Sequence, residues 1–200
     1  MIYFEYISRL PQVDVRRFHQ GVIAAQSGWE GGQDDRLLWA AGRTWRLGPG
    51  PEYVAAWDAG EAGLERIDDW DRIFRSRTAD VFEDPLREVA RIEVAGCYEA
   101  LLPATAARGG TYYAEFFQPS APVEDIADFF QNRAARHADL QLNILVRRIG
   151  LLAPEPGGIA IWTIPDFSAL AGIAAEPDEG SSPVVIVKAG AYADIGSEIL

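Results

Sequence analysis

The feature that most constrains this chain is a short motif that occurs twice. Residues 47–57 (LGPGPEYVAAW) return 105 positions later as residues 152–162 (LAPEPGGIAIW). Each copy has two prolines separated by one residue, then an apolar run that ends in tryptophan. A proline-rich turn followed by such a run predicts the second half of a β-hairpin. Two hairpins of one kind predict a supersecondary unit that the chain builds twice.

Two further similarities occur in the same order along the chain. Residues 3–5 (YFE) resemble residues 113–115 (YAE), 110 positions later, and residues 95–98 (AGCY) resemble residues 189–192 (AGAY), 94 positions later. The spacings differ because the loops between elements differ in length. Three similarities in one order favour an internal duplication.

The spacing of apolar residues predicts the order β-α-β-β-α-β in each half. In the first half we expect strands over 2–8, 36–47, 53–58 and 91–101, with helices beginning at Asp14 and running over 64–74. In the second half we expect strands over 111–118, 141–149, 159–164 and 184–193, with helices over 123–138 and after Asp166. The small residues 103–110 (PATAARGG) predict a flexible linker between two units, 1–102 and 111–200.

A β-α-β-β-α-β unit is the ferredoxin-like arrangement, an antiparallel four-stranded sheet with both helices on one face. The opposite face is also apolar and needs cover, which two tandem copies provide by pressing these faces together. The predicted fold class is therefore α+β, two tandem ferredoxin-like repeats packed sheet to sheet into a barrel. In this respect the chain resembles the dimeric α/β-barrel superfamily, as a single-chain pseudo-dimer.

That superfamily includes cofactor-free oxygenases, EthD-like and muconolactone-isomerase-like proteins, haem-binding branches and NIPSNAP proteins. Residues 47–57, followed by 63–66 (GLER) and 69–70 (DW), resemble the NIPSNAP pattern of an apolar strand that ends in tryptophan before a charged helix. No family motif matches residue by residue, so the resemblance implies a fold and transfers no catalytic residue.

Charge and composition exclude several classes of partner. A net charge of −12 argues against nucleic acid and against anionic membrane surfaces. Cys97 is the one cysteine and only two histidines occur, so no disulfide and no ligand-spaced metal site is expected. No apolar run reaches membrane-spanning length. We expect a cytoplasmic protein without cofactor.

Alternation along the strands assigns side chains to faces. Aligning residues 46–48 (RLG) with 148–150 (RIG), 102 positions apart, puts two groups of side chains on the barrel face. From the first half these are Trp39, Ala41, Arg43 and Trp45, and from the second half Gln141, Asn143, Leu145 and Arg147. Leu140, Leu142, Ile144 and Val146 are then expected on the helix side.

Two glutamates are the candidate partners of these arginines. Glu5 and Glu115 each lie in mid-strand, two residues after Tyr3 and Tyr113. Burial and a nearby arginine shift a carboxyl pKa in opposite directions, so the two acids could be tuned apart for acid–base catalysis. Structural ion pairs are the alternative.

The two histidines differ in the roles that their positions favour. His19, on the first helix, is a candidate general base or else a helix-flank residue. His137 suits the C-terminal end of its helix.

The leading hypothesis is a protein that binds a small hydrophobic or aromatic molecule in a barrel cavity, as a monomer or a homodimer. The candidate catalytic residues are Glu5, Glu115 and His19, and the candidate substrate-binding residues are Arg43, Arg147, Asn143, Trp39, Trp45, Tyr3 and Tyr113. The superfamily resemblance implies isomerase or oxygenase chemistry. The alternatives are a non-enzymatic ligand-binding or interaction protein with a filled barrel, and a haem-binding protein. A packed barrel core would contradict the cavity.

Overall fold

The structure is a computed structural model that describes residues 1–29, 36–44, 48, 51–65, 88–107, 109–153, 157–174 and 182–194. The strands are β1 (Ile2–Arg9), β2 (Arg36–Arg43), β3 (Tyr53–Asp58), β4 (Ala90–Ala100), β5 (Thr111–Pro119), β6 (Gln141–Arg148), β7 (Gly158–Ile164) and β8 (Val184–Asp194). The helices are α1 (Val15–Trp29), α3 (Val123–Arg136) and α4 (Leu170–Ala174), with a 3₁₀ turn, η4 (Phe167–Ala169), before α4.

These strands form one closed barrel in the order β1-β3-β2-β8-β5-β7-β6-β4. The first half contributes β4-β1-β3-β2 and the second half contributes β8-β5-β7-β6, which is the same order repeated. Every pairing is antiparallel, and the halves join where β2 pairs with β8 and β4 pairs with β6. The α+β prediction of two ferredoxin-like repeats in a barrel is confirmed.

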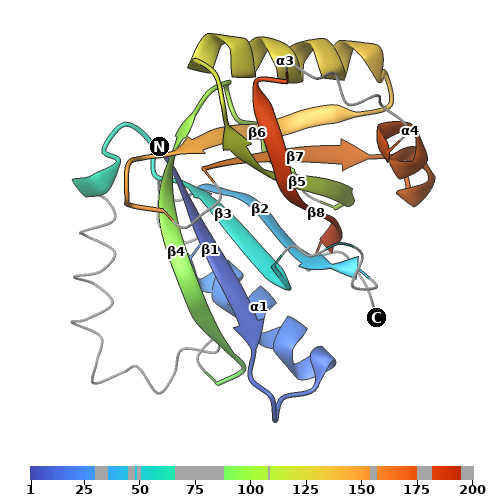
Figure 1. Cartoon of the computed structure of the whole chain (residues 1–200). Helices are drawn as coiled ribbons and strands as arrows, with labels where there is room; N and C mark the ends of the chain where they lie inside the picture. The colour runs from blue at the N-terminus through green and yellow to red at the C-terminus, as the bar shows by residue number, and fades with distance from the viewer. Residues whose placement is uncertain are drawn as a thin grey trace.

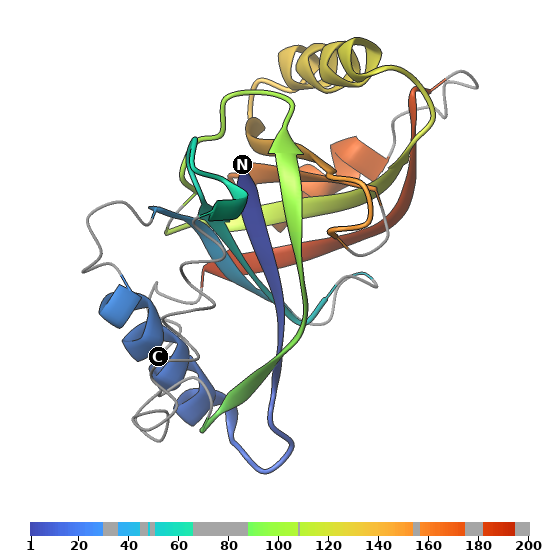
Figure 2. The ribbon, with the colours of Figure 1, turned by 90° about the vertical axis from the view of Figure 1, so that its left-hand side faces the viewer.

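The helices cover the barrel from outside. Figure 1 shows α3 lying across the strands of the second half and α1 beside those of the first half. Figure 2, turned by 90°, again places the two helices at opposite ends of the molecule. The expected helix over 64–74 lies, beyond Glu65, outside the described residues.

Local signals define where the helices begin. The Asp14 carboxylate accepts a hydrogen bond from the Arg17 backbone N–H at 2.8 Å, so it caps α1 as expected. Asp166 caps η4 in the same way through the Ser168 backbone N–H, at 2.7 Å. α1 continues to Trp29.

Three apolar clusters hold the layers together. The interior cluster fills the barrel with side chains from β1 to β8, including Phe4, Trp39, Tyr98, Tyr112 and Tyr192. A second cluster packs α1 on the outer face of the first half, around Phe18 and Leu37. A third packs α3 on the second half, around Phe130, Leu145 and Trp162.

The segment between the halves is part of this packing. The Thr105 backbone N–H donates to the Asn143 carbonyl and the Ala107 backbone N–H donates to the Leu38 carbonyl, at 2.9 and 2.7 Å. Ala107 is buried in the interior cluster. The expected flexible linker is therefore hydrogen-bonded to both halves of the chain.

Candidate functional site

Aromatic side chains fill the barrel interior. Phe4, Trp39, Tyr98, Tyr112 and Tyr192 are each 0% exposed. The Trp39 ring lies edge-on to Tyr192 and Tyr112, with ring centroids 5.4 and 5.9 Å apart. Such edge-to-face contacts are typical of a packed aromatic core. Where the expected cavity would lie, the described residues form a packed interior.

The tyrosine hydroxyls of these rings have partners inside the fold. The hydroxyls of Tyr6 and Tyr98 form a hydrogen bond of 2.9 Å, and the Tyr192 hydroxyl donates to the Pro51 carbonyl at 3.0 Å. Burial, with the Tyr98 hydroxyl as a second cause, raises the pKa of Tyr6 well above its ordinary value. Burial also raises the pKa of Tyr112 to about 12. These phenols are therefore neutral near pH 7.

Trp39 and Arg43 lie on the predicted face. Trp39 is in the interior cluster, and its indole N–H has no hydrogen-bond partner among the described residues. Arg43 lies at the end of β2, where its guanidinium donates to the Gly48 carbonyl at 3.0 Å. Burial raises the pKa of Tyr192, and the charge of Arg43 partly opposes that rise. Trp45 lies outside the described residues.

Asn143 and Arg147 do not join them, which corrects the predicted face of β6. The register of β6 on β7 shifts between Leu142 and Ile144, so Asn143 is the extra residue of a bulge. Ile144 and Val146 therefore face the interior, and Leu145 packs in the α3 layer. The predicted assignment of these three residues is wrong because a one-residue slip exchanges the two faces.

The side chain of Asn143 is held by hydrogen bonds to neighbouring segments. The Asn143 side-chain oxygen accepts from the Thr163 backbone N–H at 3.0 Å and from the Thr163 hydroxyl at 2.7 Å. Its side-chain nitrogen donates to the Thr105 hydroxyl at 3.2 Å. Arg147 pairs with Glu99 at 2.8 Å across the β4–β6 junction, where both side chains are exposed. The structure thus places Asn143 and Arg147 apart from the barrel interior.

Glu5 and Glu115 also lie outside the barrel, because Ile2, Phe4 and Tyr6 take the interior positions of β1. Trp57 donates its indole N–H to Glu5 at 3.1 Å, and Trp162 donates to Glu115 at 3.0 Å. Tyr3 and Tyr113 stand opposite these two tryptophans in the strand register. The expected pairing of Glu115 with an arginine of β2 or β6 is wrong, because α3 supplies the arginine.

That arginine is Arg133, which sequence reasoning missed. Its guanidinium donates to both oxygens of Glu115, at 2.6 and 2.8 Å, and the side chains are 8% and 2% exposed. Arg133 also lies over the Trp162 ring, 5.8 Å from the centroid. Its spacing of seven residues from core Ile126 was the available signal, since that spacing places both on one helix face.

The two histidines belong to different helix layers, and neither is a hydrogen-bond partner of Glu115 in the described part of the chain. His19 packs beside Tyr53 in the α1 layer, with ring centroids 6.1 Å apart, and partial burial lowers its pKa. His137 follows the last residue of α3, where its backbone N–H donates to the Ala134 carbonyl. Cys97 is buried, and burial raises the pKa of its thiol, which disfavours a nucleophile.

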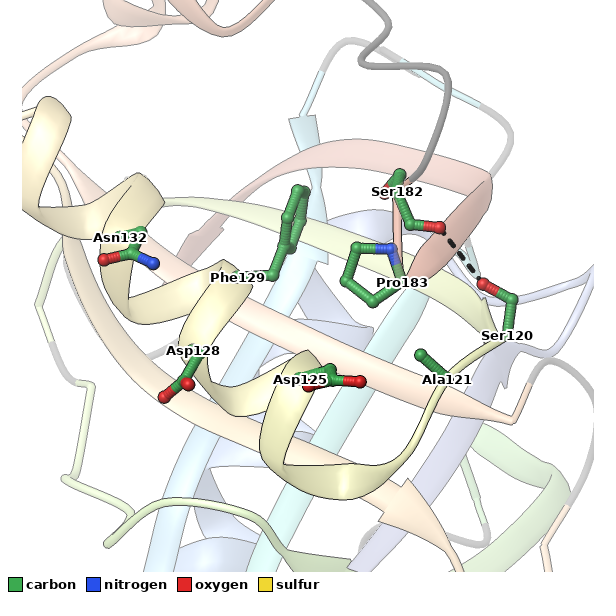
Figure 3. A pocket seen from close by; sticks show the side chains of 8 residues that line it. All are labelled: Ser120, Ala121, Asp125, Asp128, Phe129, Asn132, Ser182 and Pro183. Atoms are coloured by element: carbon green, nitrogen blue, oxygen red, sulfur yellow. Dashed lines mark hydrogen bonds between the residues drawn. The ribbon is translucent and has the colours of Figure 1, made fainter.

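An open pocket lies outside the barrel, between α3 and the segment that enters β8. Its volume is about 440 Å³, and its lining residues are Ser120, Ala121, Asp125, Asp128, Phe129, Asn132, Ser182 and Pro183. Figure 3 shows Phe129 between α3 and Pro183, with Asp125 on the side of Ala121. The Ser120 hydroxyl donates to the Ser182 carbonyl at 3.2 Å, which ties the two walls together. Sequence reasoning did not single out any of these residues.

No group of three or more metal-ligating side chains occurs within the described ranges. No helix among the described elements is long and apolar enough to cross a membrane.

Comparison with known proteins relates the chain to others through its fold. No protein-family model matches the sequence. No curated protein matches it significantly. The solved structures that resemble it include a heme-binding protein from Thermus thermophilus, with a TM-score of 0.59, 8% identity and coverage of 97% of this chain and 91% of the other.

Two other neighbours carry different names. A candidate monooxygenase from Lactobacillus acidophilus gives a TM-score of 0.57 at 10% identity, covering 97% of this chain and 94% of the other. A mutant chlorite dismutase from Candidatus Nitrospira defluvii gives 0.55 at 8% identity, covering 97% and 91%. The NIPSNAP resemblance stays a prediction. At these identities the similarity shows the fold, and this chain has the dimeric α/β-barrel fold within a single polypeptide.

Proposed function

We propose that this chain is a small-molecule-binding protein whose barrel is a packed scaffold and whose ligand site is the pocket beside α3. The observation that carries the proposal is the contrast between the two regions. The interior is filled by aromatic side chains that are 0–8% exposed, whereas the pocket is open and has a mixed polar and apolar lining. This is the filled-barrel alternative that the sequence left open, with a site outside the barrel.

The lining indicates the chemical class of the ligand. Asp125 and Asp128 supply negative charge, and Asn132 and Ser120 supply further oxygen acceptors. Phe129 supplies a ring surface on which a cation can stack. An organic cation with a short apolar part, such as a primary or quaternary amine, satisfies both requirements. The chain's net charge of −12 also attracts cations over a distance.

The test is a thermal-shift screen of aliphatic and aromatic amines against matched carboxylic acids and ketones, followed by calorimetric titration of the best amine. We expect an amine to raise the melting temperature, and Asp125→Asn with Asp128→Asn to weaken its binding at least about tenfold. Glu124→Gln is the matched control, because Glu124 is an exposed carboxylate on the same helix outside the pocket lining. Selective binding of acids or ketones, or an equal effect of the control, would contradict the proposal.

The proposal stops at binding. The isomerase or oxygenase chemistry implied by the superfamily resemblance needs a carboxylate free to exchange a proton with a substrate. Glu115 accepts hydrogen bonds from Arg133 and Trp162 in a buried layer, away from the pocket beside Asp125. Its geometry favours a structural role.

Haem binding is a second candidate, favoured by the heme-binding neighbour and by His19. Partial burial lowers the pKa of His19, so its ring is neutral near pH 7, the form that ligates a metal. The residues present do not fit the group as arranged, however, because the His19 ring already contacts Phe18 and Tyr53 within a packed layer. Titration with haemin decides the matter. A Soret band that His19→Ala removes and His137→Ala retains would replace the first proposal.

A further inference from the structure

β4 and β8 are the same strand in the two repeats, and the first half of each projects from the barrel. Residues 91–94 and 185–188 are exposed, whereas residues 96–98 and 190–192 are buried. Figure 2 shows the start of β4 beside α1 and the start of β8 at the opposite end, on the side of α3. We call residues 184–188 the β8 overhang and residues 90–94 the β4 overhang.

Each overhang has a strand on one edge. β5 pairs with β8 from Val184 to Ala193, whereas β2 reaches only Tyr192 to Asp194 on the other edge. Among the described residues no strand lies along that second edge of the β8 overhang. An unpaired strand edge of this kind offers backbone N–H and C=O groups to another strand.

The two overhangs differ in their side chains. The β4 overhang carries Arg91, whose guanidinium donates to Glu93 at 2.5 Å, and Glu93 also accepts from Ser8. Natural sheets use such charges to keep exposed edges from pairing. At the two corresponding positions, 94 residues later, the β8 overhang has Val185 and Val187, which are 57% and 47% exposed.

Ile186 between them is 39% exposed, so three consecutive apolar residues face solvent. One repeat has a charged edge, and the other has an apolar edge at the same place in the fold.

We propose that the β8 overhang pairs with the β8 overhang of a second copy of this chain, antiparallel and about a two-fold axis. With the axis at Ile186, Val185 lies opposite Val187 of the second copy, so the apolar row meets itself. Lys188 lies opposite Val184 and not opposite another lysine. Self-complementarity of this kind is what an isologous two-fold interface requires.

Charge supports a second copy as the occupant. The molecule carries a net charge of −12, so two copies repel one another overall. The β8 overhang contains no carboxylate and a single lysine. The paired residues themselves therefore bring no carboxylates together. The paired strands are short compared with interfaces that bury about 1,200 Å² or more, so we expect a reversible dimer at micromolar concentrations.

Sedimentation velocity over a concentration series tests the pairing. We expect the wild-type mass to approach twice 22.0 kDa as the concentration rises. Ile186→Lys should weaken dimerisation at least tenfold, and Ile92→Lys, at the matching position of the β4 overhang, should leave it unchanged. Circular dichroism of both variants checks that they fold. A wild type that stays monomeric throughout, or equal effects of the two substitutions, would overturn the proposal.

A covalent capture experiment tests the register. Ile186→Cys should give a disulfide-linked dimer on mild oxidation, because a residue on the two-fold axis faces its own copy. Ile92→Cys is the control, and the native Cys97 is buried and sets the background. Equal cross-linking of the two variants would show random collision and would count against the proposed axis.

Discussion

At the scale of single residues, the molecule uses one arrangement twice. Glu5 accepts a hydrogen bond from Trp57 on the neighbouring strand, and Glu115 accepts one from Trp162. The glutamate and the tryptophan that recur in the sequence are therefore hydrogen-bonded to each other in both repeats. Glu115, which is 1% exposed, also accepts hydrogen bonds from Arg133. A carboxylate so buried requires several donors.

Removing the arginine should therefore be strongly destabilising. Arg133→Met leaves the Glu115 carboxylate buried without its cation, and we expect it to lower the free energy of unfolding by roughly 3 to 5 kcal/mol. Glu99→Gln breaks the exposed pair with Arg147 and should change the free energy of unfolding by less than about 1 kcal/mol. Urea denaturation measures both. Similar losses for the two variants would show that the Arg133 pair has no special role in stability.

His19 predicts a dependence of stability on pH. Burial lowers its pKa in the folded state below the ordinary 6.5, so the unfolded chain binds more protons as the pH falls. Its contribution is fully present above about pH 6.5 and is lost as the pH decreases through the folded pKa. Thermal melts between about pH 7 and pH 5 should show a slope that His19→Gln reduces and His137→Gln retains. A slope unchanged by His19→Gln would contradict this assignment.

At the scale of elements, the order of the described strands and helices could be predicted from apolar spacing and capping residues. The faces of β6 could not, because a bulge at Asn143 leaves no clear mark in the sequence. The useful signal was the spacing of 105 between the hairpins, which relates Trp39 to Ile144 and Ala41 to Val146 as the structure does. The two Arg-x-Gly segments are 102 positions apart, three fewer than the 105 that separate the hairpins. Because side chains alternate along a strand, an alignment shifted by an odd number of residues assigns each side chain of β6 to the opposite face.

Gly48 and Gly150 follow β2 and β6, and substituting each by alanine compares how closely the chain packs at the two turns. Both have positive φ, 85° and 53°, but a Cβ at Gly48 would lie 1.9 Å from the Ala189 carbonyl oxygen, whereas one at Gly150 would meet nothing within 4 Å. We expect Gly48→Ala to lower the free energy of unfolding by roughly 2 to 6 kcal/mol, through strain and overpacking. Gly150→Ala should lower it by about 1 to 2 kcal/mol. Denaturant titration of both variants measures the difference, and equal losses would exclude the close approach.

At the scale of the whole molecule, neither half has a complete core. The interior cluster joins Phe4, Trp39 and Tyr98 of the first half to Tyr112 and Tyr192 of the second. Glu5 and Glu115 were expected inside the barrel because both faces of β1 and β5 are rich in apolar side chains. Which face becomes interior depends on how the repeats pack on one another, which no single strand encodes. The candidate site could not be predicted either, because its lining residues lie within residues 120–132 and 182–183, which are far apart in the sequence.

We propose that residues 1–102 and 111–200 are two units that fold only together. Expressed alone, residues 1–102 would expose the interior ring of Trp39 and should aggregate or remain partly unfolded. Co-expressed with residues 111–200, they should form a soluble complex with the thermal transition of one cooperative unit. Gel filtration and circular dichroism measure both outcomes. A stable, monomeric first half would contradict the proposal.

The barrel interior repeats its backbone but not its side-chain volumes. Phe4 corresponds to Ala114 and Ile2 to Tyr112, 110 positions later, so a large residue in one half occurs where the other half has a smaller one. In a homodimer both subunits have the same sequence, so a substitution changes the side-chain size at the two equivalent positions together. Joining the two units in one gene removes that constraint. Each half of this protein has then been free to evolve as the complement of the other, and neither is interchangeable with it.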